Sequence, residues 1–149
     1  MKVQGSIDIT APPEKVWPFL VEPERILKWY TLLQRFEYTT EQHSGVGTTF
    51  YMEEKAGVFM KLSFVVTEWV ENAKLAFRMT SGNFVKDYEQ AWTLEPTPSG
   101  SWFTLKEEVT MPYGPLGRVL GTFSRSSSEG HVKEILAKLK ALAEAEAVA

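Results

Sequence analysis

The chain has 149 residues, a length that predicts one domain and argues against a two-domain enzyme with a hinge. Hydrophobic residues make up 44% and charged residues 23%, a composition typical of an ordered, soluble domain rather than a disordered chain. The 16 basic and 19 acidic residues give a formal net charge of −3 with no basic run, which argues against nucleic-acid binding.

The absence of cysteine excludes thiol catalysis, disulfide frameworks and cysteine-ligated zinc, and it fits a reducing cytosol. The N-terminus lacks the continuous apolar run of a signal peptide. No stretch approaches the roughly 18 apolar residues of a transmembrane helix. We therefore expect a cytoplasmic protein without a transmembrane segment.

The first forty residues predict a strand followed by two short helices. Residues 3–10 alternate apolar and polar side chains, the period of a half-buried strand. Ala11-Pro12-Pro13-Glu14 ends it, and a short helix follows that buries Val16, Phe19 and Leu20. Pro18 lies inside this helix, which should therefore be short or kinked. A second short helix begins at residues 22–24 and carries Ile26, Leu27 and Tyr30.

Residues 33–111 predict six strands and no helix. The strands fall at 33–42, 48–54, 58–71, 75–79, 88–94 and 103–111, separated by turn signals at 43–47, 55–57, 71–74, 81–83 and 96–100. Consecutive strands joined by short turns are typical of an antiparallel meander.

A long helical pattern runs from about Leu116 to Ala145. Its two apolar stripes are Leu116, Val119, Leu120 and Phe123, and then Val132, Ile135, Leu139 and Leu142, and they are not collinear. One interpretation is a break or kink near Gly130. The other is a continuous helix whose middle, with Ser127, Gly130 and Glu134, faces a cavity.

The predicted order is strand, two short helices, six strands and one long helix. The sheet must bury its apolar face, and the long helix is the predicted element large enough to cover it. We therefore expect an α+β fold in which a curved sheet holds this helix and leaves space for a ligand between them.

Particular residues add a resemblance to this pattern. They are Ile9-Thr10-Ala11-Pro12-Pro13-Glu14-Lys15-Val16-Trp17, then Trp29, Gly45-Val46-Gly47-Thr48, Gly100 and Pro115-Leu116-Gly117. The chain resembles the START-like or Bet v 1-like superfamily (SRPBCC), and within it the bacterial polyketide cyclase/dehydrase-like group. The resemblance implies one START-like ligand-binding domain over residues 1–149. It also implies the helix-grip fold, a curved antiparallel sheet of about seven strands wrapped around the C-terminal helix.

Residues suited to metal, nucleophilic or phosphate chemistry are scarce. His43 and His131 are isolated from each other and from other ligands, so we expect no metal site. Ser124 and residues 126–128 are serines outside a Gly-x-Ser-x-Gly elbow. The glycines at 45–47 and 114–121 lack the context of a dinucleotide or phosphate loop, so no cofactor is expected.

Glu107 is the candidate catalytic residue. Its parity places it on the strand face of Leu105 and Val109, where burial would raise the pKa of its carboxyl as a general acid or base requires. The alternative is a twisted or bulged strand, or a position at the solvated rim, and the adjacent Glu108 makes a one-residue register shift easy. Tyr88 and Gln90 on the neighbouring strand would orient a ligand or satisfy each other.

The expected ligand-binding residues line the space between sheet and helix. They are Met52, Met60, Leu62, Phe77, Met79, Tyr88, Gln90, Trp92, Leu105, Phe123 and Ser127. Methionine suits irregular apolar ligands, although such side chains at strand period also form ordinary cores.

Three functions stay open. The first is binding of a small hydrophobic or aromatic molecule, lipid- or polyketide-like, which requires a ligand-sized cavity. The second, implied by the resemblance, is a cyclase or dehydratase that uses a pocket acid or base. The third is a protein-interaction module of the co-chaperone or membrane-complex-associated kind. A monomer or homodimer is expected.

Overall fold

The computed structural model describes residues 1–112 and 125–148. Its elements are β1 (Lys2–Ile9), α1 (Pro13–Val21), α2 (Pro23–Trp29), β2 (Leu33–Tyr38), β3 (Thr49–Ala56), β4 (Val58–Val70), β5 (Lys74–Gly82), β6 (Asp87–Thr97), β7 (Gly100–Thr110) and α4 (Arg125–Ala147). Within these ranges, no helix combines the length and the apolarity that crossing a membrane requires.

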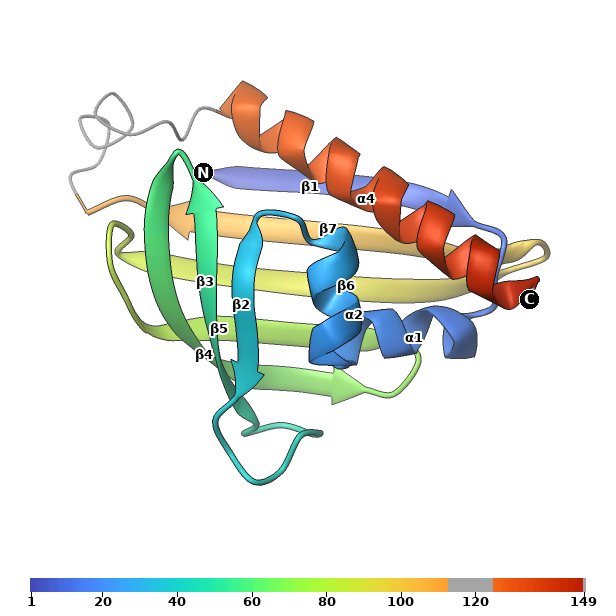
Figure 1. The fold of residues 1–149 in the computed structure, drawn as a ribbon, viewed down its shortest axis with the longest axis horizontal. Helices are drawn as coiled ribbons and strands as arrows, with labels where there is room; N and C mark the ends of the chain where they lie inside the picture. The colour runs from blue at the N-terminus through green and yellow to red at the C-terminus, as the bar shows by residue number, and fades with distance from the viewer. Residues whose placement is uncertain (113–124, 149) are drawn as a thin grey trace.

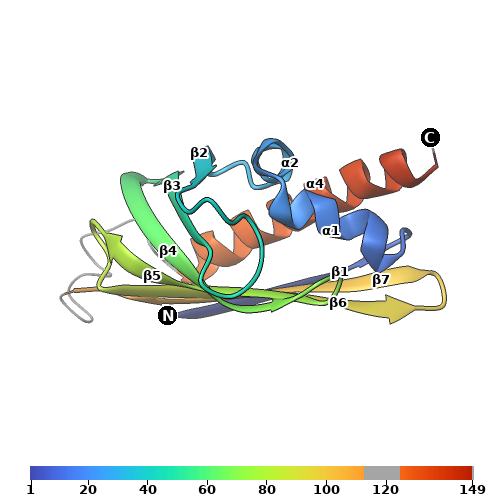
Figure 2. The same ribbon diagram turned by 90° about the horizontal axis from the view of Figure 1, so that it is seen from below.

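The seven strands form one antiparallel sheet in the order β1-β7-β6-β5-β4-β3-β2. Strands β2 to β7 are a meander, and β1 pairs with the last strand through partners such as Val3 and Glu107. Register shifts between β4 and β5 bend the sheet. Figures 1 and 2 show α1, α2 and α4 all on one face of this curled sheet. The predicted helix-grip architecture is confirmed.

The two short helices form where the proline pattern predicted them. Pro13 occupies the first turn of α1, where its missing N–H costs no helical bond, and the helix continues through Pro18 for only nine residues. It buries Val16, Trp17 and Phe19, and the seven-residue α2 buries Ile26 and Trp29. Both helices are too short to be stable alone, so packing against the sheet holds them.

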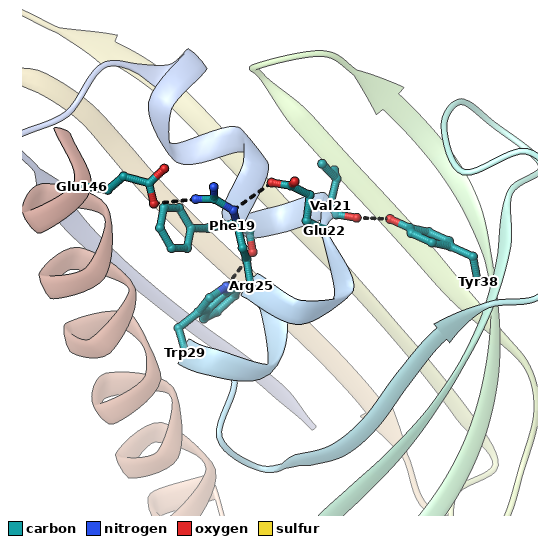
Figure 3. Close-up of polar contacts among 7 residues, drawn as sticks. All are labelled: Phe19, Val21, Glu22, Arg25, Trp29, Tyr38 and Glu146. Atoms are coloured by element: carbon teal, nitrogen blue, oxygen red, sulfur yellow. Dashed lines mark hydrogen bonds and ion pairs between the residues drawn. The ribbon is translucent and has the colours of Figure 1, made fainter. Parts of the chain in front are cut away.

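Side chains fix the corner between α1 and α2, as Figure 3 shows. The Trp29 indole Nε1 donates to the Phe19 carbonyl at 2.7 Å, and the Tyr38 hydroxyl of β2 donates to the Val21 carbonyl. Both acceptors lie in the last turn of α1, whose final carbonyls have no partners within the helix. Side chains of α2 and β2 therefore donate hydrogen bonds to carbonyls in the last turn of α1.

An ion-pair group joins the same corner to the C-terminal end of α4 (Figure 3). The Arg25 guanidinium lies 2.5 Å from the Glu146 carboxylate and 2.9 Å from that of Glu22. It also lies over the Phe19 ring, with its central carbon 4.9 Å from the ring centroid. The end of α4 is thus attached to α1 and α2 by one side chain.

The C-terminal half of α4 also binds the backbone at the end of β1. Lys140 Nζ donates to the Asp8 carbonyl at 2.6 Å and contacts the Glu144 carboxylate at 2.7 Å. Glu144 in turn accepts from the Thr10 N–H at 2.7 Å. Two backbone groups at this edge of the sheet therefore find partners in helix side chains.

Helix α4 is continuous from Arg125 to Ala147, so the interpretation that places a break near Gly130 is wrong. Gly130 and Glu134 are exposed rather than facing a cavity, while Val132, Ile135, Leu136 and Leu139 are buried. The predicted N-terminal part of this helix, 116–124, lies outside the described residues. Close packing on β1 depends on Gly5, because a Cβ there would lie 2.5 Å from Val132 Cγ1.

Candidate functional site

A buried polar group lies within the aromatic core between the sheet and the helices. Period-two alternation along β6 places Tyr88, Gln90 and Trp92 on the concave face, each at most 3% exposed. The same alternation along β3 puts Glu54 on that face after Phe50 and Met52, and Glu54 is 3% exposed. Polar atoms this deep require partners.

Hydrogen bonds join these side chains into one continuous network. Trp92 Nε1 donates to Gln90 Oε1 at 2.7 Å, and Gln90 Nε2 donates to the hydroxyls of Tyr30 and Tyr88, each at 2.9 Å. The Tyr88 hydroxyl donates to Glu54 Oε2 at 3.2 Å. The amide of Gln90 thereby fixes both hydroxyls, and one of them is directed at the carboxyl of Glu54.

Glu107 faces the same side of the sheet as this group. It pairs with Gln90 of β6 and Val3 of β1, and the β6–β7 ladder carries no register shift. The proposed bulge is therefore absent there. Glu107 is half-buried between the fully buried Leu105 and Val109, so it lies toward the rim of the concave face.

The two carboxyls have strongly raised pKa values. Burial raises the pKa of Glu54 to about 8, and the nearby charge of Glu107 adds to the effect, while the hydrogen bond from Tyr88 opposes it. Burial raises the pKa of Glu107 to about 7, again opposed by Tyr88. Near neutral pH this pair can hold a proton on one carboxyl and a charge on the other, which suits general acid and base chemistry.

A small hollow separates this pair from the N-terminal half of α4. It has a volume of about 20 Å³ and is bordered by residues that include Tyr30, Leu32, Glu54, Glu107, His131 and Ile135. A second inner hollow of about 10 Å³ lies among aromatic side chains near Phe36 and Trp69. The first has room for about one water molecule, and the second for barely one.

The predicted ligand-binding residues divide between the packed core and the rims of these hollows. Met52, Met60, Leu62 and Leu105 are buried in the core, and Met79 is half-buried. Tyr88 and Gln90 belong to the buried polar group. Phe77 and Trp92 border the second hollow, and the exposed Ser127 borders the first. Phe123 lies outside the described residues. Their roles in binding stay predictions.

Three residues at the site were not predicted from the sequence. Tyr30 was assigned to the core of a short helix, Glu54 to the end of a strand, and His131 to an isolated position. The structure brings all three to the hollow with Glu107. The alternation of Phe50, Met52 and Glu54 is the signal that would have placed Glu54 inside. Within residues 1–112 and 125–148, no three histidine or acidic side chains are grouped as metal ligands.

A larger, open groove of about 490 Å³ lies on the outer face of the sheet. Ala76 and Ala91, cross-strand neighbours on β5 and β6, lie among longer side chains that include Lys2, Glu89 and Lys106. It is separated from the helices by the sheet. Its size reflects short side chains surrounded by long ones. Gln90 and Glu107 also border this groove, while the alternation along β6 and β7 directs their side chains to the opposite face.

Known proteins resemble this chain in sequence and in structure. An uncharacterized protein of Mycobacterium tuberculosis is 24% identical over 121 residues, which cover 75% of this chain and 68% of that protein. A START superfamily protein from Mycobacterium smegmatis aligns with a TM-score of 0.69 at 15% identity, over 98% of this chain and 96% of that one. At such identity the likeness shows a shared fold.

The di-domain ARO/CYC protein StfQ of the steffimycin biosynthetic pathway also shares the fold. It aligns with a TM-score of 0.75 at 12% identity, over 99% of this chain and 52% of its own length. The family described as "Polyketide cyclase / dehydrase and lipid transport" matches residues 1–144. The resemblance drawn from the sequence is confirmed, and the chain belongs to this polyketide cyclase/dehydrase and lipid transport family.

Proposed function

We propose that this protein binds a small hydrophobic or aromatic molecule, lipid- or polyketide-like, between the sheet and α4. The observation that carries the proposal is the pair of carboxyls at the hollow between the sheet and α4, with Glu54 buried and Glu107 half-buried. The apolar body of the ligand would contact core side chains, and its polar group would meet the two carboxyls. The family's description and the ARO/CYC relative support this class of ligand.

The polar group would hold one end of the ligand in a fixed orientation. A protonated Glu54 donates a hydrogen bond, and an ionised one accepts two or more. Gln90 fixes the Tyr88 hydroxyl that faces Glu54, so rotation of these groups is restricted before a ligand arrives. Such preorganised polar atoms favour ligands with a carbonyl or hydroxyl at one end.

Binding would require the hollow to widen, because about 20 Å³ holds only a water-sized group. Residues 127–135 of α4 form one of its walls. The opposite end of α4 is held by Arg25 and by the β1 backbone. We infer that the N-terminal half of α4 moves away from the acid pair when a ligand enters.

A second candidate function is aldol-type cyclisation or dehydration, which a pair of carboxyls with raised pKa values favours. Near neutral pH one carboxyl of the pair can carry a proton while the other is ionised. An ionised Glu107 would remove a proton from carbon beside a carbonyl, and a protonated Glu54 would donate to the carbonyl oxygen, giving an enol. That enol adds to a second carbonyl and closes a ring, its O–H proton returns to Glu54, and Glu107 gives the proton it removed to the new oxygen. Loss of the resulting hydroxyl with a neighbouring hydrogen as water completes the reaction.

Native mass spectrometry of the protein from its own host tests binding directly. We expect a complex carrying one apolar molecule, released on denaturation and identified by its mass. The isolated compound is then titrated back onto the wild type, Glu54→Gln, Glu107→Gln and the surface control Glu41→Gln. Weaker binding by the two site variants alone supports the proposal, and unchanged binding by both would refute the assigned site.

The same compound separates the carrier from the enzyme. If the protein converts it, and Glu107→Gln abolishes conversion while the compound still binds, the enzyme hypothesis holds. If the compound is recovered unchanged after prolonged incubation at neutral pH, the protein is a carrier. If the protein purified from its host carries no bound compound, 2-naphthol, an aromatic with one hydroxyl, serves as the probe. Loss of its binding in Glu54→Gln is then the expected result.

A further inference from the structure

Two phenylalanines are exposed at the end of the molecule that carries the hollow. Phe59, at the start of β4, is 41% exposed, and Phe84, between β5 and β6, is 55% exposed. Figures 1 and 2 show the β3–β4 turn, the β5–β6 turn and the first turns of α4 at this same end. Single exposed apolar side chains are normal, whereas exposed aromatic side chains on two segments that contact each other indicate an interaction surface.

The backbone around these rings is held in place. Asn83 joins the two segments, because its Nδ2 donates to the Phe59 carbonyl at 3.3 Å and its Oδ1 accepts from the Lys61 N–H at 2.7 Å. Phe84 has a φ of 65°, a left-handed conformation that is rare for a bulky residue. Its side chain stays exposed despite this strain, while the adjacent Val85 is buried.

Three exposed lysines surround the rings. Lys55 lies directly across from Phe59 in the β3–β4 ladder, Lys61 is two residues along β4, and Lys86 follows Phe84 by two residues. We call Phe59, Phe84 and these three lysines the docking patch. The patch is basic although the whole chain has a net charge of −3.

Two acids lie beside the docking patch and offset part of its charge, which leaves the three lysines in excess. Glu53, across the ladder from Lys61, accepts from the Tyr51 hydroxyl at 2.7 Å. Asp87 accepts from the Tyr88 N–H at 3.0 Å. No described ion pair includes Lys55, Lys61 or Lys86. These lysines are therefore available to bind negative charge on a partner.

We propose that the docking patch binds the surface of a bilayer that contains anionic lipids. Phenylalanine rings insert at the boundary between headgroups and acyl chains, and lysines bind the negative headgroups. A second copy is a poorer occupant, because a two-fold contact places the same patch on both sides and sets lysines against lysines. This inference does not rest on the proposed ligand, although Lys55 adjoins Glu54 at the hollow.

Flotation of the full-length protein with vesicles tests the proposal. The vesicles contain phosphatidylcholine alone or phosphatidylcholine mixed with phosphatidylglycerol. We expect binding to the mixed vesicles, little binding to phosphatidylcholine, and release by salt, which screens the lysines. The variant Phe59→Thr with Phe84→Asn should bind about tenfold more weakly or worse. Asparagine tolerates the left-handed backbone at position 84, so the fold is retained.

Charge variants and matched controls make the result specific. Changing Lys55, Lys61 and Lys86 to glutamine should reduce binding to the mixed vesicles by a similar factor. The same change at Lys15, Lys28 and Lys138, which are exposed elsewhere, should reduce it much less. Val70→Thr, at a residue 55% exposed at the other end of β4, should leave it unchanged.

Three outcomes would overturn the proposal. The first is a wild-type protein that does not float with the mixed vesicles. The second is equal binding by wild type and both patch variants, with circular dichroism showing all of them folded. The third is a concentration-dependent dimer, seen by light scattering, that Phe59→Thr with Phe84→Asn dissociates, since this would make a second copy the occupant.

Discussion

The Tyr88 hydroxyl of β6 donates to the Glu54 carboxylate of β3 at 3.2 Å, although β5 and β4 lie between these strands in the sheet. A flat sheet would hold the two strands about 14 Å apart, at nearly 5 Å per strand. The curl of the sheet therefore creates this contact. The Phe64 ring of β4 lies beneath it, 5.5 Å from the Tyr88 ring in an edge-on arrangement. Curvature thus assembles the acid site.

Stability should fall as pH rises from about 5 to about 8. The pKa of Glu54 is raised from 4.5 to about 8, and that of Glu107 to about 7, so in this window the folded state binds more protons than the unfolded state. More protons in the folded state mean that the free energy of unfolding decreases with pH. Glu54→Gln should flatten the curve and exceed wild-type stability at about pH 8 by on the order of 2 kcal/mol. Denaturant titrations across pH measure both effects.

The matched control for this prediction is Glu41→Gln, which removes an exposed acid in the β2–β3 loop. It should keep the wild-type slope. A wild-type curve that is flat between about pH 5 and 8 would contradict the raised pKa values of both acids.

Tyr88→Phe should destabilise the protein by about 1–3 kcal/mol, because it removes a buried hydroxyl that donates to Glu54 and accepts from Gln90. The bond from Tyr88 lowers the pKa of both acids, so its loss should move the pH-dependent transition to higher pH. Tyr51→Phe is the control, since Tyr51 donates to Glu53 on the outer face, and it should change stability much less than Tyr88→Phe. Equal effects of the two variants would argue against a special role for Tyr88.

Gly5→Ala should push α4 away from β1 and destabilise the protein by about 1–3 kcal/mol. The new Cβ would lie 2.5 Å from Val132 Cγ1 and 3.0 Å from Leu136 Cδ1. Val132 is β-branched and buried, so its side chain has few other rotamers. Val132→Ala removes the clash. The double variant should therefore lose less stability than the sum of the losses caused by the two single substitutions. Strict additivity in this double-mutant cycle would contradict the packing argument.

Gly130→Ala should stabilise the protein by about 0.5–1 kcal/mol, because alanine restricts the unfolded chain and favours the helix. Gly130 lies inside α4, and an added Cβ meets no atom within 4 Å. A rise in the midpoint of thermal unfolding measures the gain. A fall would indicate that α4 needs a flexible position there.

Trp29→Phe and Arg25→Gln should have very different costs although both side chains join the corner shown in Figure 3. Trp29 is fully buried and donates to the Phe19 carbonyl, so its replacement should cost about 2–4 kcal/mol. The Arg25 ion pairs are partly exposed, and their loss should cost under about 1 kcal/mol. Chemical denaturation of both variants, in low and high salt, distinguishes the buried contact from the screened one.

The order of elements could be predicted because local rules act at each boundary. Alternation placed the strands, and the prolines at 12, 13 and 23 placed both short helices. Boundaries were less accurate. The predicted strand 33–42 ends at Tyr38, because the Gln42 amide donates to Ser44, Val46 and Thr48 and organises a loop in its place. Such side-chain bonds to the backbone leave no periodic signal.

The candidate site could be predicted only in part. The alternation of side chains along β6 and β7 placed Tyr88, Gln90 and Glu107 on the concave face, because alternation alone decides which face of a sheet a residue occupies. The approach of Glu54 to Tyr88 depends on how far the sheet curls, and that of His131 on where α4 crosses it. Neither quantity is encoded in a local pattern. The sequence therefore identified one of the two acids of the pair.

The contacts of α4 with β1 have a consequence for how this protein behaves at high concentration. β1 is an edge strand, and a free edge is a template on which strands of other molecules can add and start aggregates. Lys140 already occupies the Asp8 carbonyl, and Glu144 the Thr10 N–H. The same helix that covers the concave face thus blocks strand addition at the end of β1, and its C-terminal turns should oppose aggregation that starts there.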